Sequence, residues 1–226
     1  MAQRSVFFDT ETSGFSPKAG HRIVEIGAIE VINNAPTGRE FHFYLNPERE
    51  IDKRAQEVHG ISLEMLKDKP KFSEIAEDFI EFVKGADLIA HNISFDESHV
   101  DNELTLAGYD ITLQSLANSL VDSLDIAKEL FPGKKHNLDA LCDKLNVDRT
   151  HRTSHGALLD AKILYEVTAR MLQKRSEIEQ LKQSTGSSTL PVLIRSYASV
   201  RFVAPNEKQA EHEAFLHRIG AKAQEQ

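Results

Sequence analysis

The order of the predicted elements limits the possible folds of this chain more than any other feature of the sequence. Three segments rich in Val, Ile and Phe, typical of β-strands, lie close to the N-terminus at residues 5–8, 22–32 and 40–45. Helical spacing of apolar residues, interrupted by a short strand-like segment at 87–90, follows in five stretches: 72–83, from about 95 to Gly108, 125–131, 138–145, and 156 to about 182. Strands that come first and then alternate with helices predict an α/β domain with a mixed sheet.

The composition supports one globular domain with an appendage. Of the 226 residues, 40% are hydrophobic and 27% are charged, which is enough apolar material for a buried core. The single cysteine, Cys142, excludes an internal disulfide framework, and its helical spacing with neighbouring leucines predicts a buried thiol. No apolar run approaches the roughly 20 residues of a membrane span, and the N-terminus does not resemble a signal peptide. We therefore expect a soluble, cytoplasmic protein.

The net charge of −8 restricts the way in which this chain could bind nucleic acid. Proteins that grip duplex DNA by neutralising its phosphates present a basic face, so that mode of binding is disfavoured. An enzyme that holds one nucleic-acid end through metal ions is permitted, because a carboxylate cluster makes such a site acidic. Weak binding of the substrate would then favour a partner that delivers it.

A polar linker separates the main region, residues 1–182, from a short C-terminal segment. Residues 183–189 read Gln-Ser-Thr-Gly-Ser-Ser-Thr, which is typical of a flexible linker. Residues 190–226 contain two short apolar runs and a helix-like stretch at 206–219, but a segment of this size cannot bury much surface alone. It therefore either packs back on the main region or docks on a partner.

Two acidic residues follow the first predicted strand. Residues two apart in a strand project to the same side, so Asp9 and Glu11 are expected to point together. Two like charges at that spacing repel each other, and burying either one alone is unfavourable. A divalent cation between them removes both problems, although a solvated strand end with two unrelated acids would give the same pattern.

A further acidic residue lies where a short strand meets a helix, within residues 91–96. Ser94 followed by Glu97 matches a capping box and predicts a helix that begins near residue 95, with Asp96 in its first turn. The helix dipole alone favours a carboxylate there, so a metal is not required. The same geometry would place an oxygen ligand beside the acids of the first strand if the two strands are neighbours.

The third motif, His155-Gly156-Ala157-Leu158-Leu159-Asp160, begins the last predicted helix. Five positions along a helix are about 1.4 turns, so His155 and Asp160 would be near each other without being stacked. Gly156 allows backbone or substrate to approach closely. A histidine at a helix start and an unrelated surface acid would account for the motif equally well.

Together the three motifs supply four carboxylates and one histidine. Carboxylate oxygens without cysteine companions suit Mg²⁺ or Mn²⁺ better than zinc. Two such ions, ~4 Å apart, are a known arrangement for the in-line cleavage of phosphodiesters. A histidine, with an ordinary pKa of about 6.5, suits taking a proton from water near neutral pH. We therefore predict two metal ions held by Asp9, Glu11, Asp96 and Asp160, with His155 as general base.

In this order and spacing, the three motifs resemble the exonuclease motifs of the DEDD superfamily. The histidine that precedes the last aspartate marks the DEDDh branch of that superfamily. Within the branch, the chain is similar to the epsilon (proofreading) subunits of bacterial DNA polymerase III. The similarity covers about residues 5–175 and includes four further stretches: 23–28, 58–61, 131–134 and 138–142.

This resemblance implies an RNase H-like fold with a central five-stranded mixed sheet, and an activity that removes mismatched 3′-terminal nucleotides from DNA as monophosphates. It implies the metal ligands and the base named above. It also implies that residues 190–219 dock on the catalytic (alpha) subunit of the polymerase at the replication fork, where a small accessory subunit can join. The residues implied to contact the substrate are Asp9, Thr10, Glu11, His59 and Asp160.

Two departures from the family pattern limit what is carried over. Arg54 stands where well-known members have a glutamate, which puts substrate contact at that position in doubt. Residues 173–188 are polar and charged and contain no convincing sliding-clamp motif, so direct clamp binding is doubtful.

Two other functions stay open on the sequence. A free-standing DEDDh exonuclease that acts on RNA or DNA 3′ ends in processing or repair would share the motifs but would lack the polymerase-binding segment. A nuclease-like scaffold without activity would lack at least one of the five site residues, and all five are present.

Overall fold

The computed structural model describes residues 3–150 and 155–184. Contacts divide the chain into two units, with the boundary after Met171. Of the second unit, the structure describes only the last part of one helix. The predicted C-terminal segment, 190–226, and most of the predicted linker before it lie outside the described residues.

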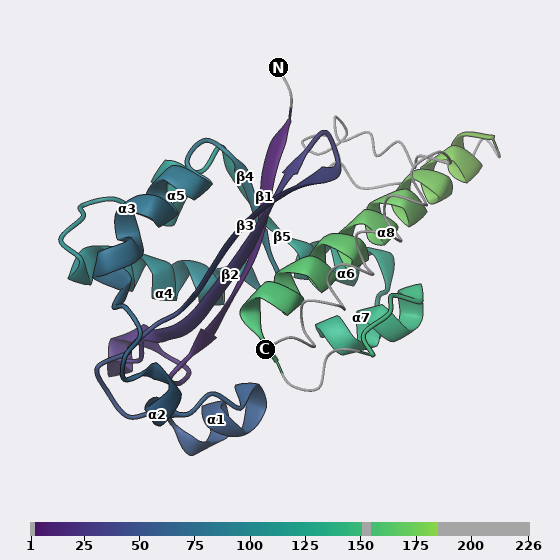
Figure 1. Ribbon diagram of the computed structural model, residues 1–226. Helices are drawn as coiled ribbons and strands as arrows, with labels where there is room; N and C mark the ends of the chain where they lie inside the picture. Colours follow the sequence, from purple (N-terminus) through teal and green to yellow (C-terminus); the bar gives the residue numbers. More distant parts are fainter. Residues whose placement is uncertain (1–2, 151–154, 185–226) are drawn as a thin grey trace. The chain divides into compact units, whose positions relative to one another are not determined.

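A five-stranded sheet forms the centre of the first unit (Figure 1). Its strands are β1 (Arg4–Thr12), β2 (Ile23–Ile32), β3 (Ala35–Tyr44), β4 (Asp87–Ala90) and β5 (Ser119–Asp122). In the sheet order β3-β2-β1-β4-β5, the first three strands are antiparallel neighbours, and β4 and β5 run parallel to β1. The α/β class and the mixed five-stranded sheet are therefore confirmed.

Helices cover both faces of this sheet. Figure 1 shows α3, α4 and α5 on one side and α6, α7 and the start of α8 on the other. The helices of the described residues are the 3-10 helix η1 (Pro17–Ala19), α1 (Lys53–His59), α2 (Leu63–Leu66), α3 (Phe72–Val83), α4 (Ile93–Leu106), α5 (Leu113–Leu116), α6 (Ser123–Leu130), α7 (Leu138–Leu145) and α8 (Ala157–Ser184). The predictions over 72–83, 87–90 and 138–145 agree with these bounds.

Strand β1 sends alternate side chains to opposite faces of the sheet. Phe8 is fully buried in the core cluster to which α3 and α4 contribute. Phe7 points the other way and packs edge-on against Tyr165 of α8, with ring centroids 5.3 Å apart. Because the alternation continues along the strand, Asp9 lies on the α8 face and Thr10 on the α4 face.

Gly27 of β2 lets the start of α8 rest directly on the sheet. A side-chain carbon at this position would lie only 2.1 Å from the backbone nitrogen of Leu158. Gly27 is also the cross-strand partner of Asp9. The absence of a side chain here therefore sets the first turn of α8 against the strand end that carries Asp9.

The start of α4 differs from the sequence prediction. The prediction that Ser94 and Glu97 form a capping box is wrong, because the helix already begins at Ile93. Its N-cap residue is Asn92, whose backbone is in the left-handed conformation (φ 65°). The Asn92 N–H donates to Asp122 Oδ1 at 2.9 Å. An acid at the end of β5 therefore holds the helix start, and the sequence around the helix gives no sign of it.

Several smaller features bear on the sequence predictions. Cys142 is buried, as expected. Gln183 and Ser184, the first two residues of the predicted linker, belong to α8. η1, β5, α1, α2 and α5 were not predicted, because elements this short carry little periodicity, although the equally short β4 was recognised from its apolar residues. Within the described ranges, no helix combines the length and the apolar character needed to cross a membrane.

Replacing Gly27 with alanine is expected to displace α8, because the added carbon meets backbone that cannot rotate away. We expect a loss of about 1–3 kcal/mol in the free energy of unfolding, measured by chemical denaturation. Gly156→Ala is the control, since its added carbon meets nothing closer than Glu25 Oε2 at 3.9 Å. Equal losses in the two variants would contradict the packing argument.

Candidate active site

Four acidic side chains from three distant parts of the chain meet at one end of β1. Asp9 and Glu11 lie on β1, Asp96 in the first turn of α4, and Asp160 in the first turn of α8. Glu11, Asp96 and Asp160 are buried, and Asp9 is partly buried. Burial raises the pKa of Asp9 well above its ordinary value, and the charges of Asp96, Glu11 and Asp160 raise it further. The four carboxylates therefore act on one another electrostatically.

Thr10 holds Asp96 in this group. Its Oγ1 donates to Asp96 Oδ1 at 2.7 Å from the face of β1 that packs on α4. Burial raises the pKa of Asp96 to about 7, although the hydrogen bond from Thr10 opposes that shift. Asp96 is thus fixed in a place that disfavours its negative charge unless a cation is nearby.

His155 reaches the acids from the segment before α8. Its Nδ1 lies 3.3 Å from Asp160 Oδ2, and its backbone N–H donates to the Val58 carbonyl at 3.5 Å. Single ligand atoms of Glu11, His155 and Asp160 lie within 4.8 Å of one another, whereas Asp9 and Asp96 lie outside this tight group. The sequence predicted a helix from Gly156, with His155 and Asp160 near each other at its start. The expected proximity of the two side chains is confirmed, and His155 lies just before the helix, which begins at Ala157.

The donor set of this cluster fits divalent cations. All four acids offer carboxylate oxygens, the ligands that Mg²⁺ and Mn²⁺ prefer. The pKa values of Asp9 and Asp96 are raised because their negative charges are buried and close to other negative charges. A cation bound between them would reverse both effects, since it favours the charged form of each carboxylate.

His59, at the end of α1, presents a hydrogen-bond donor to the same region. It is 4% exposed, and its Nδ1 accepts from the Ile61 N–H at 3.0 Å, so its hydrogen is on Nε2. Among the described residues, Nε2 has no hydrogen-bond partner. Burial lowers the pKa of His59, while the Thr12 backbone and Glu25 act in the opposite direction. His59 is therefore a neutral donor close to the end of β1.

Sequence reasoning missed a fifth acid beside the site. Glu25 of β2 is the cross-strand partner of Glu11 and is 2% exposed. Its Oε1 lies 2.7 Å from His42 Nε2, and its charge also raises the pKa of Asp9. The feature of the sequence that could have revealed Glu25 is an acidic residue in the middle of an otherwise apolar strand.

Phe15 is a second residue that sequence reasoning missed. It lies in the loop between β1 and η1 and is 83% exposed, which is unusual for so large an apolar side chain. Its ring lies 5.8 Å from that of Phe95, the residue before Asp96. The aromatic pair therefore borders the acids on the α4 side.

A small polar network fixes α1 to the end of β1. The Asp52 N–H donates to the Ser13 carbonyl at 2.8 Å. The ring of His21 lies between the two residues, 3.3 Å from Ser13 Oγ and 3.4 Å from Asp52 Oδ2. Because α1 carries His59 and the carbonyl that accepts from His155, this network positions both histidines.

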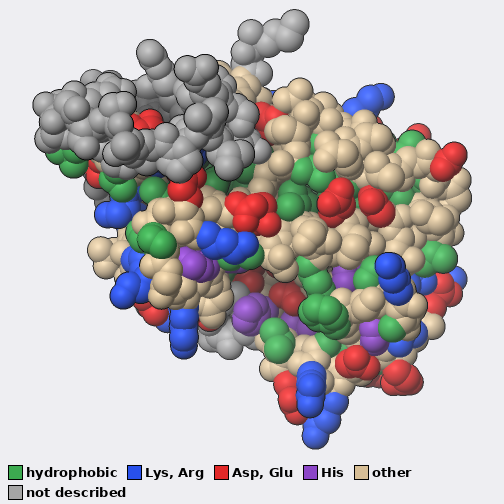
Figure 2. Space-filling view, turned by 180° about the vertical axis from the view of Figure 1, so that it is seen from behind, with side chains coloured by type: hydrophobic (Ala, Val, Ile, Leu, Met, Phe, Trp, Pro, Cys, Tyr) green, Lys and Arg blue, Asp and Glu red, His purple; other side chains and the backbone are tan. Residues whose placement is uncertain are grey.

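Histidine and acidic side chains lie close together on one face of the protein (Figure 2). Arg54 is exposed on α1, and no contact of the described residues gives it a role.

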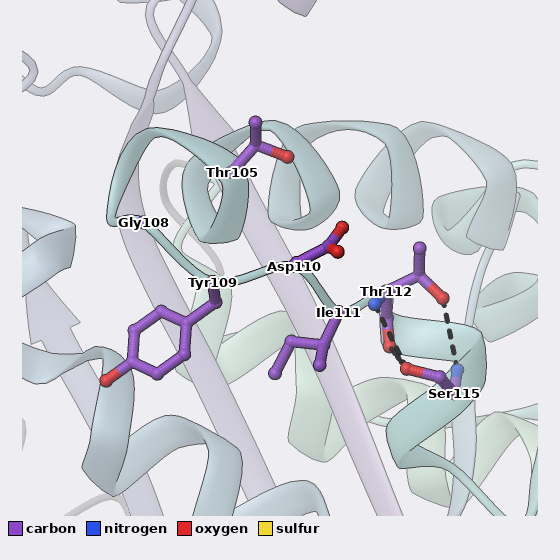
Figure 3. A pocket seen from close by; sticks show the side chains of 7 residues that line it. All are labelled: Thr105, Gly108, Tyr109, Asp110, Ile111, Thr112 and Ser115. Carbon is purple, nitrogen blue, oxygen red and sulfur yellow. Dashed lines mark hydrogen bonds between the residues drawn. The ribbon is translucent and has the colours of Figure 1, made fainter.

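A separate shallow pocket lies between the C-terminal end of α4 and α5, lined by residues from Thr105 to Ser115 (Figure 3). In it, the Thr112 and Ser115 side chains accept from each other's backbone N–H groups, at 3.2 and 3.0 Å, to cap α5. None of the four acids lines this pocket.

Comparisons with known proteins agree with this geometry. A family model described as "Exonuclease" matches residues 6–168. The DNA polymerase III subunit epsilon of Rickettsia conorii is 44% identical over 222 residues, covering 96% of each chain. The subunit of the same name from Escherichia coli is 41% identical over 229 residues, covering 97% of this chain and 94% of the relative.

Solved structures with a similar fold are exonucleases. One is E. coli exonuclease I in complex with a dA16 oligonucleotide, with a TM-score of 0.67, 19% identity, and coverage of 80% of this chain and 43% of that chain. Another is the nuclease domain of 3′hExo, a DEDDh family member, bound to rAMP, with a TM-score of 0.64, 17% identity, and coverage of 76% and 93%. At these identities the likeness concerns the fold, which is the RNase H-like exonuclease fold.

Asp96→Asn is expected to stabilise the metal-free protein at alkaline pH. The folded state keeps the proton of Asp96 up to about pH 7, whereas the ordinary pKa is 3.8, so folding binds a proton between these values. Stability of the parent therefore falls as the pH rises from about 4 to about 7, and the loss is complete above that.

At pH 8, without divalent ions, the melting temperature of Asp96→Asn should exceed that of the parent by roughly 2–8 °C. This shift corresponds to a gain of about 1–2 kcal/mol in the free energy of unfolding. At pH 4 the two proteins should melt at nearly the same temperature. A variant less stable than the parent at pH 8 would show that the Asp96 charge is not unfavourable in the fold.

Proposed function

The chain belongs to the family of DNA polymerase III epsilon subunits, and on that premise we propose that it is a 3′→5′ DNA exonuclease that proofreads for a replicative DNA polymerase. The observation that carries the proposal is the meeting of Asp9, Glu11, Asp96 and Asp160 with His155 at one end of β1. The reaction is the hydrolysis of the terminal phosphodiester, which releases a deoxynucleoside monophosphate. A cytoplasmic location at the replication fork follows from the proposal.

The four acids are proposed to hold two divalent ions, Mg²⁺ or Mn²⁺. Membership of this exonuclease family implies dependence on divalent metal. Ions bound there would polarise the scissile phosphate and lower the pKa of a nearby water. The protein contributes carboxylates whose positions are fixed before binding: Asp96 by Thr10, and Asp160 by the packing of α8 on Gly27.

His155 is proposed to take the proton of the attacking water. It lies at the edge of the acid cluster with 42% of its side chain exposed, so water reaches it freely. The contact between its Nδ1 and Asp160 orients the ring, and the bond from its backbone to Val58 fixes the segment that carries it. General bases held in this way contribute about 10²- to 10⁴-fold to the rate.

Substrate contacts are proposed for residues around the acids. The Nε2–H of His59 is buried near the backbone of Thr12, and we propose that it donates to an oxygen of the terminal nucleotide once the substrate enters the site. The exposed ring of Phe15 offers a surface on which a base can stack. The side chain of Thr10 is occupied by Asp96, which leaves its backbone for the substrate. Asp9, Glu11 and Asp160 would meet the substrate at the scissile phosphate.

The partner is proposed to be the catalytic (alpha) subunit of the polymerase. Relatives named as epsilon subunits match over 94–96% of their own length, so the match extends beyond the exonuclease domain, 1–182. We propose that residues 190–219 dock on that subunit after the linker at 183–189. A small accessory subunit is compatible with this arrangement, and direct binding to the sliding clamp is not proposed.

The function is tested by digesting a 3′-mismatched DNA primer–template with the purified full chain, in Mg²⁺ or in EDTA, beside an RNA strand of equal length. We expect metal-dependent release of deoxynucleoside monophosphates and little action on RNA. Rapid trimming of RNA with poor cleavage of DNA would instead identify a free-standing ribonuclease. Cleavage of neither would leave a nuclease-like scaffold.

The same assay tests His155. The variant His155→Ala should lose about 10²- to 10⁴-fold in kcat, because the attacking water would lose the base that is positioned to take its proton. Added imidazole should restore part of the rate, and the melting temperature should stay close to that of the parent. Full activity of His155→Ala at neutral pH would show that the base has been assigned to the wrong residue.

A further inference from the structure

The carboxyl ends of three parallel strands form one continuous edge beside the acids. β1 ends just beyond Asp9 and Glu11, β4 lies next to β1, and β5 lies next to β4. Asp122 at the end of β5 accepts from the Asn92 N–H and from the Leu124 N–H, both at 2.9 Å. This edge runs from the end of β1 that carries the acids to the end of β5. Two strand spacings, about 10 Å, separate β1 from β5.

The loop between α6 and α7, residues 131–136, is fixed to this edge. His91, the first residue after β4, donates from Nε2 to the His136 carbonyl at 2.7 Å and accepts at Nδ1 from Ser123 Oγ at 2.7 Å. His136 closes the loop, because its Nε2 donates to the Phe131 carbonyl at 2.8 Å. One hydrogen bond therefore connects the loop to the sheet edge at His136, and a second closes the loop on itself.

Two adjacent lysines, Lys134 and Lys135, stand exposed on this loop. Neither makes an ion pair with an acidic side chain among the residues that the structure describes. Nearby lysines are occupied: Lys128 pairs with Asp125 at 3.0 Å, and Lys144 lies 4.3 Å from the centre of the Phe131 ring. In a chain with a net charge of −8, two available cations on a fixed loop are distinctive.

The direction of the substrate strand follows from the other flank of the site. His59 is close to Thr12 and Glu25, on the β2 side of β1, whereas the loop is on the β4 side. If His59 meets the terminal nucleotide, the rest of the strand leaves over β4 and β5. At the ~3.4 Å rise per nucleotide of a duplex strand, ~10 Å corresponds to about three nucleotides, and a more extended single strand covers it with about two.

We propose that Lys134 and Lys135 bind phosphates of the substrate DNA strand about two or three nucleotides upstream of the cleaved bond. This inference rests on the proposed exonuclease function. It assigns a nucleic-acid contact outside the acid cluster and away from α1. It also gives an acidic protein a local basic surface for a short single-stranded 3′ end.

The test compares substrates with and without upstream phosphates. The full chain and Lys134→Gln/Lys135→Gln are assayed on the p-nitrophenyl ester of thymidine 5′-monophosphate and on a ten-nucleotide single strand. We expect kcat/KM to fall at least 5-fold further on the ten-mer than on the ester. The slope of log(kcat/KM) against log[salt] on the ten-mer should become shallower by about 1.4, at about 0.7 for each lost contact.

Lys69→Gln/Lys84→Gln is the matched control, because it removes the same charge from two other exposed lysines. Lys84 precedes β4 and so lies at the opposite edge of the sheet. The variant Arg54→Gln removes a positive charge from α1 and tests whether the DNA strand passes over that side of the site instead. A selective loss on the ten-mer in Arg54→Gln, or an equal loss in the control, would overturn the proposed path.

The two levels of the proposal fail in different ways. If the parent degrades DNA and the Lys134/Lys135 variant keeps the parent's salt slope and its kcat/KM on the ten-mer, the loop contact is wrong and the exonuclease function stands. If the parent releases no nucleotide from DNA with Mg²⁺ or Mn²⁺, the proposed function falls, and the loop contact falls with it.

Discussion

Repulsion among carboxylates held together at the end of β1 is the constraint on which the rest of this structure depends. Asp9 and Asp96 both have pKa values above the ordinary range, first because burial disfavours their charges and, for Asp9, also because other acids surround it. A free chain in water would let these groups separate. The fold keeps them together and so maintains a strong local preference for cations.

Packing that is independent of the acids holds them in place. The first turn of α8 lies against the backbone of β2 because Gly27 has no side chain, and Asp160 is brought in with that turn. Thr10 holds Asp96 from the opposite face of β1. The His21 network fixes α1, and through it the two histidines of the site. These contacts connect the core of the fold to the geometry of the reaction.

The sequence was most informative where the interactions are local. The helix over 138–145 could be bounded to the residue, because Asn137 caps it and its apolar spacing is regular. The four acids were predicted to lie together because the three short motifs that carry them occur in one characteristic order and spacing. What the sequence could not supply was contacts between distant segments. The Asp122 carboxylate accepts from the N–H of Asn92 and so fixes the start of α4, although Asp122 lies 30 positions after Asn92 in the chain.

Glu25 and Phe15 show a second limit of sequence reasoning. An acid inside a strand is usually read as facing solvent, whereas Glu25 is 2% exposed and its Oε1 lies 2.7 Å from Nε2 of His42 on β3. An aromatic residue after a glycine is usually read as core, whereas Phe15 is exposed. In both cases burial depends on the neighbouring element, which no pattern within the segment reveals.

The central claim, that the four acids form one site for two divalent ions, is tested most directly by titrating Mn²⁺ into the full chain at pH 8 in a calorimeter. The account predicts two ions per chain for the parent. It predicts at most one for Asp9→Asn, with the remaining ion bound at least about tenfold more weakly, since Asp9 is electrostatically coupled to the other three acids. Two ions bound to Asp9→Asn with the affinity of the parent would contradict it.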